Sequence, residues 1–333
     1  LSARLPVTVF AADHWTRDPL ARLNLALYPS GTTWTWSQLL EQRAHLHRGT
    51  QACLHLQLTN HARDTFTHDL DSRIRTGDAD AITVKVHHVQ CCARETGIPF
   101  TQAPSPTRGW KVPPTLWRTL VQNRLLIPTR LYCQPCLAKQ QYDPASDVFG
   151  LHAQVCAHGY GMTRRHHRLR DELIELGYRR LHDRVTKEES FGRGRQYAID
   201  LYLPDAHQAI DVSLMSPHKA THRRGFLSCA QGGPAGLARR ESDKRAKYAA
   251  LLLHSPPVQT LGFGMTSYGV FGPQATTILA DRARVFAQRT NLPYAWCHRQ
   301  LAGRLVLCVL VANALATVVR RPHPNPGLPI PLT

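Results

Sequence analysis

The chain has 333 residues, enough for two domains of ordinary size, and its 41 Lys and Arg outnumber its 23 Asp and Glu to give a formal net charge of +18. This excess favours a polyanionic partner, most often nucleic acid, over an anionic membrane surface, because the basic residues do not form one amphipathic stripe. Three of the nine cysteines stand with a histidine at metal-ligand spacing, and the other six show no framework pattern. This usage indicates metal binding in a reducing compartment and disfavours a secreted disulfide scaffold.

Residues 1–110 form an N-terminal region for which the sequence predicts no function. Within it, 34–47 is predicted to be a short amphipathic helix, and the alternating apolar residues of 81–89 predict a strand. Four prolines between 103 and 114 predict a domain boundary.

A helix at 116–127 and a small zinc module are predicted to make up a second segment, 115–160. Four potential ligands, Cys133, Cys136, His152 and Cys156, stand at the spacing of a structural zinc site, with two ligands from a tight turn and two from one helical turn. The alternatives are that His158 replaces Cys156 as the fourth ligand, or that the four residues are unrelated.

The segment 161–320 is predicted to be a mixed α/β domain, a sheet flanked by helices. Its expected elements are a helix at 163–177, strands at 185–189, 197–203 and 208–215, a helix at 237–253, a strand at 258–262, a helix ending at 289 and an apolar helix at 299–320. The very apolar stretch within the last helix has about 15 residues where a membrane-spanning helix needs roughly 20, so we expect a buried core helix. Residues 321–333 are a proline-rich tail.

Two of these strands each carry an aspartate after an isoleucine, Asp200 and Asp211. On adjacent antiparallel strands joined by a tight turn, the two carboxylates can lie together and share a cation, and Mg²⁺ prefers such oxygen ligands. The alternative is that both aspartates are strand-end residues in surface ion pairs.

The helix at 237–253 offers Lys244 and Lys247, with Tyr248 on the same face. A lysine from this helix could orient a water or stabilise a transition state at the aspartates. The alternative is a solvated face.

In their order these features resemble the C-terminal region of non-LTR retrotransposon polyproteins, in which a Cys-Cys-His-Cys zinc knuckle and an Arg-His-Asn helix precede a restriction-like endonuclease of the PD-(D/E)XK type. The similarity covers about 115–320. The resemblance implies a restriction-endonuclease-like core with Asp200 and Asp211 as the metal-binding acids, Lys244 and Lys247 as the helix lysines, and Mg²⁺ as the catalytic ion. The chain departs from the family at His167, where the family has Asn, at Ile199, where it often has proline, and in the long loop at 216–236.

The resemblance further implies a DNA endonuclease that nicks target DNA for retrotransposon insertion, in the nucleus, next to a reverse transcriptase domain and with the element RNA as a possible partner. The basic helix and the basic loop predict salt-sensitive DNA binding through Arg164, Arg165, His166, Arg168, Arg223 and Arg224. The alternatives are a catalytically dead nuclease fold that binds nucleic acid as a zinc-stabilised module, and a zinc-stabilised RNA-binding scaffold.

We predict that the purified chain carries one tightly bound zinc ion. The Cys136→Ser variant should lose it, because a three-ligand site binds zinc far more weakly, and the segment 129–160 should then unfold. Elemental analysis of both proteins measures this. Zinc-free wild-type protein, or a variant with its full zinc content, would contradict the prediction.

Overall fold

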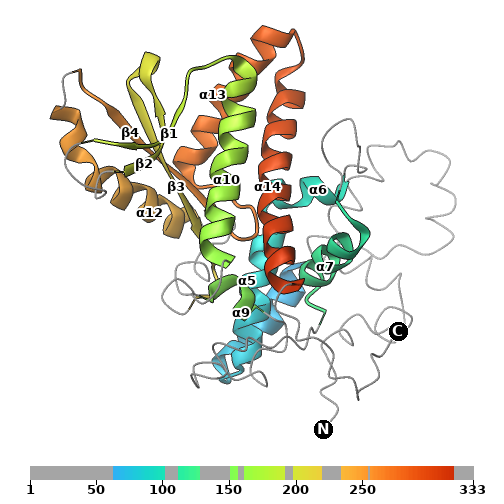
Figure 1. The fold of residues 1–333 in the computed structure, drawn as a ribbon. Coiled ribbons are helices and arrows are strands. Elements are labelled where there is room, and N and C mark those ends of the chain that lie inside the picture. The colour runs from blue at the N-terminus through green and yellow to red at the C-terminus, as the bar shows by residue number, and fades with distance from the viewer. Residues whose placement is uncertain are drawn as a thin grey trace, which may run out of the picture. The chain divides into compact units, whose positions relative to one another are not determined.

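The computed structural model describes residues 63–101, 112–127, 151–156, 161–191, 198–219, 234–253 and 256–318 (Figure 1). The chain divides into two compact units, residues 1–82 and 83–333. The predicted helix at 34–47 and the tail at 321–333 lie outside the described residues.

A four-stranded mixed sheet forms the centre of the second unit, in the order β1 (Thr186–Ser190), β2 (Ala198–Leu203), β3 (Gln208–Met215) and β4 (Gln259–Thr266). Strand β2 is antiparallel to both β1 and β3, and β4 is parallel to β3. The turn between β2 and β3 is a short 3-10 helix, η6 (Pro204–Ala206), closed by His207 in the left-handed conformation. The connection from β3 to β4 runs through α12 (Pro234–Lys247) and the 3-10 helix η7 (Ala249–Leu253).

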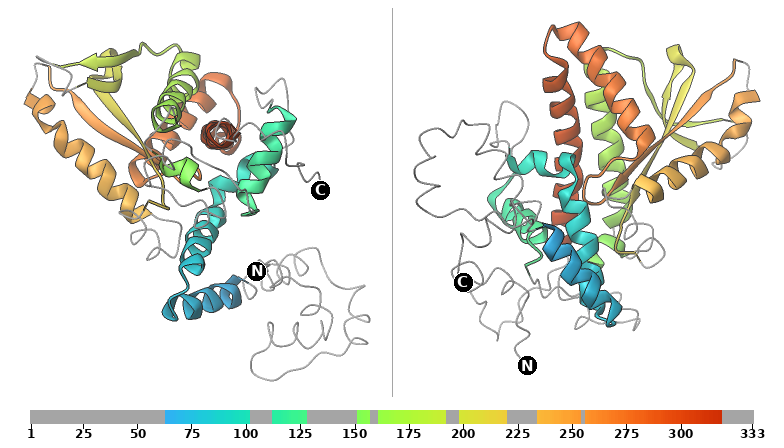
Figure 2. Two further views of the ribbon diagram at one scale, coloured as in Figure 1. Left: turned by 60° about the horizontal axis from the view of Figure 1, so that its bottom comes forward. Right: turned by 180° about the vertical axis from the view of Figure 1, so that it is seen from behind.

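Helices cover both faces of the sheet (Figure 2). One face carries α10 (Gly161–Gly177), α13 (Pro273–Thr290) and α14 (Tyr294–Val318), and the other carries α12. The larger core joins the first set to the sheet, with Leu169 and Leu173 of α10 in the same cluster as Ile210 and Val212 of β3. These α10 residues are four apart, so they project from one helical face onto the sheet.

The opposite face has a smaller core. Tyr248 and Leu251, which follow α12, pack against Ile199 of β2 and Ala209 of β3. Because successive residues of a strand point to opposite faces, Ala209 and Ile210 belong to different cores. The strands β2 and β3 are therefore buried on both sides, and α12 packs against β4 and β3.

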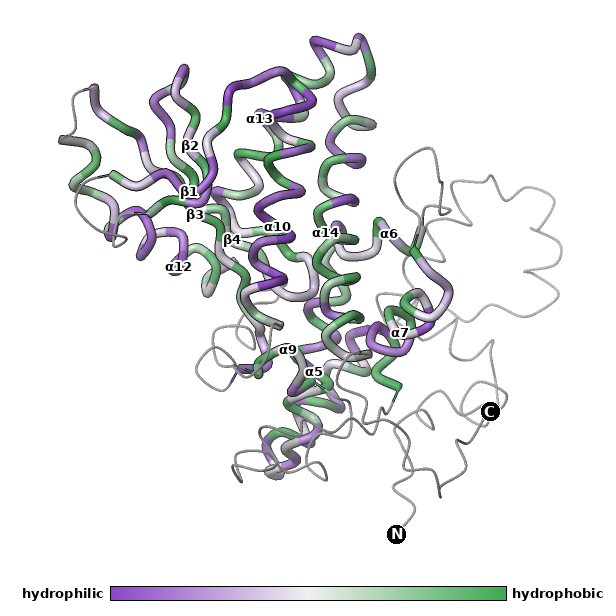
Figure 3. Tube along the Cα trace, in the orientation of Figure 1, coloured by the Kyte–Doolittle hydropathy of each residue, from purple (hydrophilic) through white to green (hydrophobic). Residues whose placement is uncertain are grey.

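The predicted apolar core helix corresponds to α14, which packs against α10, α13 and α7 (Pro114–Arg124). It is largely hydrophobic along its length (Figure 3). By length and composition alone it could cross a membrane, but 61% of its apolar window is buried inside the protein. An apolar helix buried on several sides is typical of the interior of a globular domain.

Shorter elements that pack against α14 are the 3-10 helix η2 (Arg94–Gly97), α6 (Ile98–Thr101) and α9 (His152–Val155). Helix α5 (Ala79–Cys92) precedes η2 in the chain. The 3-10 helix η4 (Arg179–Leu181) follows α10 and packs against α10 and α13. A further helix covers residues 63–75.

The prediction of a strand at 81–89 is wrong, because this segment lies within helix α5. The Asp78 carboxylate accepts hydrogen bonds from the backbone N–H groups of Asp80 and Ala81, as a helix N-cap does. The buried residues Val84, His87 and Gln90 recur every three positions, which is helical spacing.

The mixed α/β class agrees with the prediction. Strand β3 has the predicted bounds, whereas the helix predicted at 237–253 ends at Lys247 and continues as η7. Strand β4 continues to Thr266, four residues beyond its predicted end at 262.

A buried carboxylate, Glu241, ties α12 to both β4 and α13. Its Oε1 accepts hydrogen bonds from the N–H groups of Gly264 (3.1 Å) and Ala275 (3.0 Å), and its Oε2 accepts one from Gln274 (2.9 Å). The last two N–H groups belong to the first turn of α13, where a negative charge is favoured by the helix dipole. Glu241 is 2% exposed.

We predict that Glu241→Gln lowers the free energy of unfolding by about 2–4 kcal/mol, because the new amide N–H₂ faces backbone donors and leaves at least one of them unsatisfied. Asp243→Asn is the matched control, since Asp243 is exposed on the same helix and should change stability by less than about 0.5 kcal/mol. Urea unfolding of the two variants measures the difference. Equal effects would show that Glu241 does not hold α12 in place.

Candidate active site

The antiparallel ladder between β2 and β3 stops just before the two aspartates. Its last pair is Leu201 with Ile210, although β3 remains paired with β4 through Met215. Beyond that pair the N–H of Val212 donates to Asp200 Oδ2 at 2.8 Å. A side chain therefore takes the place of the backbone acceptor that a continued ladder would provide.

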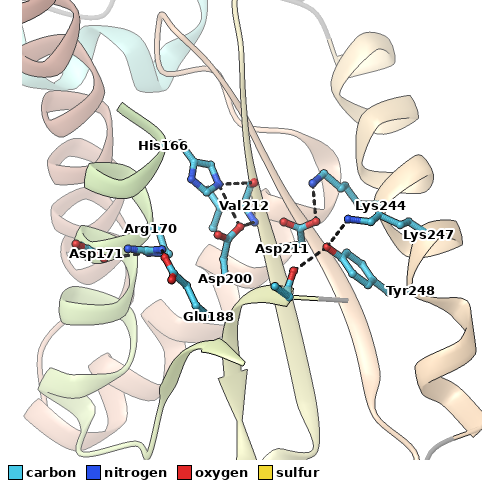
Figure 4. A network of polar contacts seen from close by, with 11 residues as sticks. His166, Arg170, Asp171, Glu188, Asp200, Asp211, Val212, Lys244, Lys247 and Tyr248 are labelled. Atoms are coloured by element: carbon cyan, nitrogen blue, oxygen red, sulfur yellow. Dashed lines mark hydrogen bonds and ion pairs between the residues drawn. The ribbon is translucent and has the colours of Figure 1, made fainter. Parts of the chain in front are cut away.

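The pairing of β2 with β1 is also interrupted at this point, although the register is the same on both sides of the missing pair Glu188–Asp200. The pairs pass from Lys187–Leu201 to Glu189–Ile199, and between them Glu188 has a left-handed φ of 51°. A non-glycine residue held in the left-handed conformation within a strand is typical of functional sites. Arg170 of α10, which is itself buried, holds the Glu188 carboxylate (Figure 4).

His166 of α10 closes this opening. Its Nε2 lies 3.1 Å from Asp200 Oδ2 and 3.0 Å from the carbonyl oxygen of Val212. A carbonyl oxygen only accepts, so this contact requires the tautomer with hydrogen on Nε2. The hydrogen bond to Asp200 raises the pKa of His166, with further support from the Val212 carbonyl, although burial opposes the rise.

The two aspartates meet between α10 and α12 (Figure 4). Their carboxyl groups are close enough to share a hydrogen bond, Asp200 lying toward His166 and Asp211 toward Lys244. Lys244 Nζ lies 2.6 Å from Asp211 Oδ2 in an ion pair whose side chains are 18% and 7% exposed.

The two carboxyl groups differ in acidity. Burial and the neighbouring Asp200 raise the pKa of Asp211 to about 6, although Lys244 lowers it. Burial also opposes ionisation of Asp200, but the hydrogen bonds from His166 and the Val212 N–H leave its pKa below its ordinary value. Because the two pKa values are shifted apart, the buried site need not hold two negative charges at the same time.

Lys244 is brought to Asp211 by the fixed position of α12. Glu241 lies three residues earlier and Tyr248 four residues later, on the same side of the helix. The Tyr248 hydroxyl donates to the carbonyl oxygen of Ala198 at 3.0 Å, which attaches this end of α12 to β2.

Lys247 is engaged by Tyr248. Its Nζ lies 3.0 Å from the Tyr248 hydroxyl and 4.6 Å from the centre of the ring. The structure thus brings the predicted residues Asp200, Asp211 and Lys244 together and places Lys247 one contact away.

The basic residues predicted to bind DNA have different positions. Arg164 and Arg168 are exposed on α10, whereas His166 belongs to the aspartate site. The prediction that Arg165 binds DNA is wrong, because the residue is 3% exposed and its Nη1 donates to Asn313 Oδ1 at 2.9 Å. Asn313 Nδ2 in turn donates to the Ser267 carbonyl at 2.6 Å, so Arg165 joins α10 to α14 inside the protein. Arg223 and Arg224 lie outside the described residues.

Half of the predicted zinc site is described. His152 begins α9 and Cys156 follows its end, one helical turn later, with the Cys156 N–H bonded to the His152 carbonyl. Cys133 and Cys136 lie outside the described residues, as does His158. In the part of the chain that the structure describes, no three His, Cys, Asp or Glu side chains lie together as a ready metal cluster.

Sequence reasoning did not assign two residues that shape the site. His166 was grouped with the basic residues, and no signal in the sequence separates it from its neighbours in that run. Glu241 had no sequence signal beyond being an acid among basic residues, because its partners lie 23, 33 and 34 positions further along the chain.

Comparisons of the chain with protein-family models, curated proteins and solved structures find no match.

We predict that Asp211 in metal-free protein titrates near pH 6 and that Lys244→Met moves its pKa higher, because the ammonium group favours the ionised carboxylate. Carboxyl ¹³C NMR measures both values. Since the pKa is higher in the folded than in the unfolded chain, the unfolded state ionises first. Between about pH 4 and 6 the free energy of unfolding should therefore fall as pH rises, by on the order of 2–3 kcal/mol.

The Asp211→Asn variant is the control for this linkage, because it should lack that part of the pH dependence. An Asp211 resonance that titrates near pH 4 would contradict both statements.

Proposed function

We propose that this chain is a metal-dependent endonuclease that hydrolyses a phosphodiester bond of DNA. The observation that carries the proposal is the opening between β2 and β3, where Asp200 and Asp211 lie together with Lys244 against one of them. Two acids and a lysine in a strongly basic chain suit a substrate made of phosphates.

The donor groups at the opening fit a hard divalent cation. Asp200, Asp211 and the Val212 carbonyl supply only oxygen atoms, which Mg²⁺ prefers, and Mg²⁺ keeps several water ligands and so needs few protein ligands. The raised pKa of Asp211 also supports the fit, because a cation between two buried carboxylates relieves the repulsion that otherwise retains a proton.

A bound divalent cation would favour ionisation of a water and offset negative charge on the phosphate. The remaining tasks belong to side chains. Asp200 and Asp211 would hold the ion, and His166 would orient the Asp200 carboxylate through its Nε2–H. Lys244 would donate a hydrogen bond to the phosphate, where charge increases as the attacking oxygen bonds to phosphorus and the bond to the 3′ oxygen breaks. The products would be a 3′ hydroxyl and a 5′ phosphate.

Two exposed arginines of α10 support binding of the DNA backbone to this helix. Arg164 and Arg168 are exposed and four residues apart, so they share one face of α10 on which phosphates can bind. Such contacts position a duplex without reading its sequence.

The order of elements adds support for the finer assignment. Helix α10, strands β1 to β3, helix α12 and strand β4 follow one another as the resemblance to restriction-like endonucleases of the PD-(D/E)XK type implies. On this basis we propose that the reaction is a nick in target DNA for retrotransposon insertion. From the same resemblance we propose a structural zinc ion and a nuclear location. We also propose a neighbouring reverse transcriptase domain and the element RNA as partners.

A second candidate follows from the same site. Lys244 already contacts Asp211, and His166 already contacts Asp200, so both carboxylates have partners without a metal ion. The same contacts are compatible with a protein that binds nucleic acid and does not cut it. In that case DNA affinity persists without Mg²⁺-dependent cleavage.

We predict that the full chain nicks supercoiled plasmid with Mg²⁺ and that Asp200→Ala abolishes nicking while DNA affinity is unchanged or slightly raised, since one negative charge is lost. Lys244→Ala should slow the reaction by about 10²- to 10³-fold, the usual effect of removing one donor to a developing charge. A plasmid-nicking time course with filter binding of the same proteins measures both.

Arg239→Ala is the control for loss of a cation from α12, because Arg239 is exposed on that helix away from the aspartates and should leave the rate within about twofold. DNA binding without any nicking by the wild type would favour the binding module. Nicking by Asp200→Ala at the wild-type rate would place the active site elsewhere.

A further inference from the structure

The turn that joins α13 to α14 carries a group of exposed apolar side chains. Leu292, Tyr294 and Trp296 are 40%, 43% and 39% exposed, and the last two are the exposed aromatic residues of the part of the chain that the structure describes. Tyr294 and Trp296 stand two residues apart in the first turn of α14, so they present rings on different sides of the helix end.

Tyr294 also closes a hollow against the last turns of α13. The hollow has a volume of 330 Å³ and is lined by Tyr294 with Arg284, Ala287 and Gln288. The three α13 residues are spaced as one helical face, and the volume lies at the lower end of the range of about 300–1,000 Å³ for ligand pockets. A planar ring the size of a nucleobase suits such an open, partly aromatic hollow.

The segment that carries these rings is rich in arginine. Between 281 and 299 the chain has four arginines, Arg282, Arg284, Arg289 and Arg299, against a single acid, Asp281. Arg284 pairs with Asp281, and the carboxylate of Asp183 is shared between Arg282 and Arg289. Arg299 is exposed, and among the described residues it has no ion-pair partner.

Aromatic side chains beside arginines are typical of surfaces that bind single-stranded nucleic acid, where bases stack on the rings and phosphates meet the cations. Protein interfaces also use aromatic residues and arginine. A second copy of this chain is disfavoured as the occupant, because both copies carry a net charge of +18.

The turn is remote from the aspartates. It lies at the end of α14 away from α9 (Figure 1), whereas Arg165, next to His166, contacts Asn313 near the other end of α14. From Asn313 to Tyr294 is 19 residues (313 − 294), which at about 1.5 Å per residue is about 28 Å.

We infer that Tyr294, Trp296, Arg284 and Arg299 form a second nucleic-acid site, which binds unpaired DNA by base stacking at a distance from the bond that is cut. This inference rests on the proposed endonuclease function, and it assigns the strand separated from its complement beside the nick as the ligand. The site needs no metal.

The test uses the full chain and a fluorescein-labelled oligodeoxythymidine, with binding measured by fluorescence anisotropy. Trp296→Ala should weaken binding about 5- to 150-fold, the equivalent of one lost stacking contact. Trp296→Phe should restore most of the affinity. Leu292→Ala is the matched control, because Leu292 is equally exposed and apolar but offers no ring, and it should change affinity by less than about twofold.

Two comparisons identify the ligand. Affinity for a duplex of the same length should be insensitive to Trp296→Ala, and oligouridine should bind no more tightly than oligodeoxythymidine. Equal losses for single strand and duplex, tighter binding of oligouridine, or wild-type affinity of the Trp296→Ala variant would each overturn the inference. So would sedimentation showing that wild-type protein is a dimer and Trp296→Ala a monomer, because the surface would then join two copies.

The failure of this inference is separable from failure of the proposed function. Asp200→Ala should bind oligodeoxythymidine like the wild type, so loss of nicking leaves the second site intact. Conversely, if Trp296→Ala leaves oligodeoxythymidine binding unchanged while the wild type nicks plasmid, the endonuclease stands and the second site does not.

Discussion

The position of α12 depends on the buried carboxylate of Glu241, and the candidate active site depends on α12. Three backbone N–H groups converge on this carboxylate from β4 and from the first turn of α13. The approach is so close that a Cβ on Gly272 would lie 2.3 Å from Glu241 Oε1, and a Cβ on Gly262 would lie 2.9 Å from the Glu241 Cα. Only glycine fits at these two positions, so the backbone itself forms the cradle.

This arrangement also protects the edge of the sheet. β4 is a terminal strand, and its outward N–H groups would otherwise lack partners. Gln274 Oε1 accepts the N–H of Gly262 and Glu241 accepts that of Gly264, so both donors are satisfied by side chains. The same contacts set the rotation of α12, and Lys244, one turn beyond Glu241, consequently faces Asp211.

At the opening between β2 and β3, hydrogen bonds to side chains replace the hydrogen bonds of a regular ladder. A continued ladder would use Val212 on both its N–H and its carbonyl, each bond contributing about 1 kcal/mol. Here the N–H goes to Asp200 and the carbonyl to His166, so the groups stay satisfied while two carboxylates occupy the space. Buried polar groups at low dielectric interact strongly, which accounts for the opposite pKa shifts of Asp200 and Asp211.

Local patterns in the sequence predicted much of the fold and part of the site. The alternation from Gln208 to Met215, bounded by a turn, was enough to define β3, and the spacing of Lys244 and Tyr248 placed both on one helical face. The alternation at 81–89 misled because the same apolar residues also satisfy helical spacing, and the Asp78 cap decides for the helix.

What the sequence did not reveal depends on contacts between distant positions. His166 meets Asp200 across 34 residues, and Arg165 meets Asn313 across 148. Nothing in the basic run Arg164 to Arg168 distinguishes an arginine that faces solvent from one that is buried. That distinction is set by the angle at which α10 crosses the sheet and α14, and this angle is a property of the packed core.

The adjacent residues Arg165 and His166 of α10 make different contacts. Arg165 lies inside the protein against α14, and His166 contacts the aspartate site. Their directions differ by the roughly 100° that separates successive residues of an α-helix. Leu169 and Leu173 fix the helix on the sheet. A single-residue insertion between His166 and Leu169 would therefore rotate both polar residues away from their partners at once. An insertion before Gly161 would leave them in place, so the segment entering α10 can vary in length while the helix itself cannot.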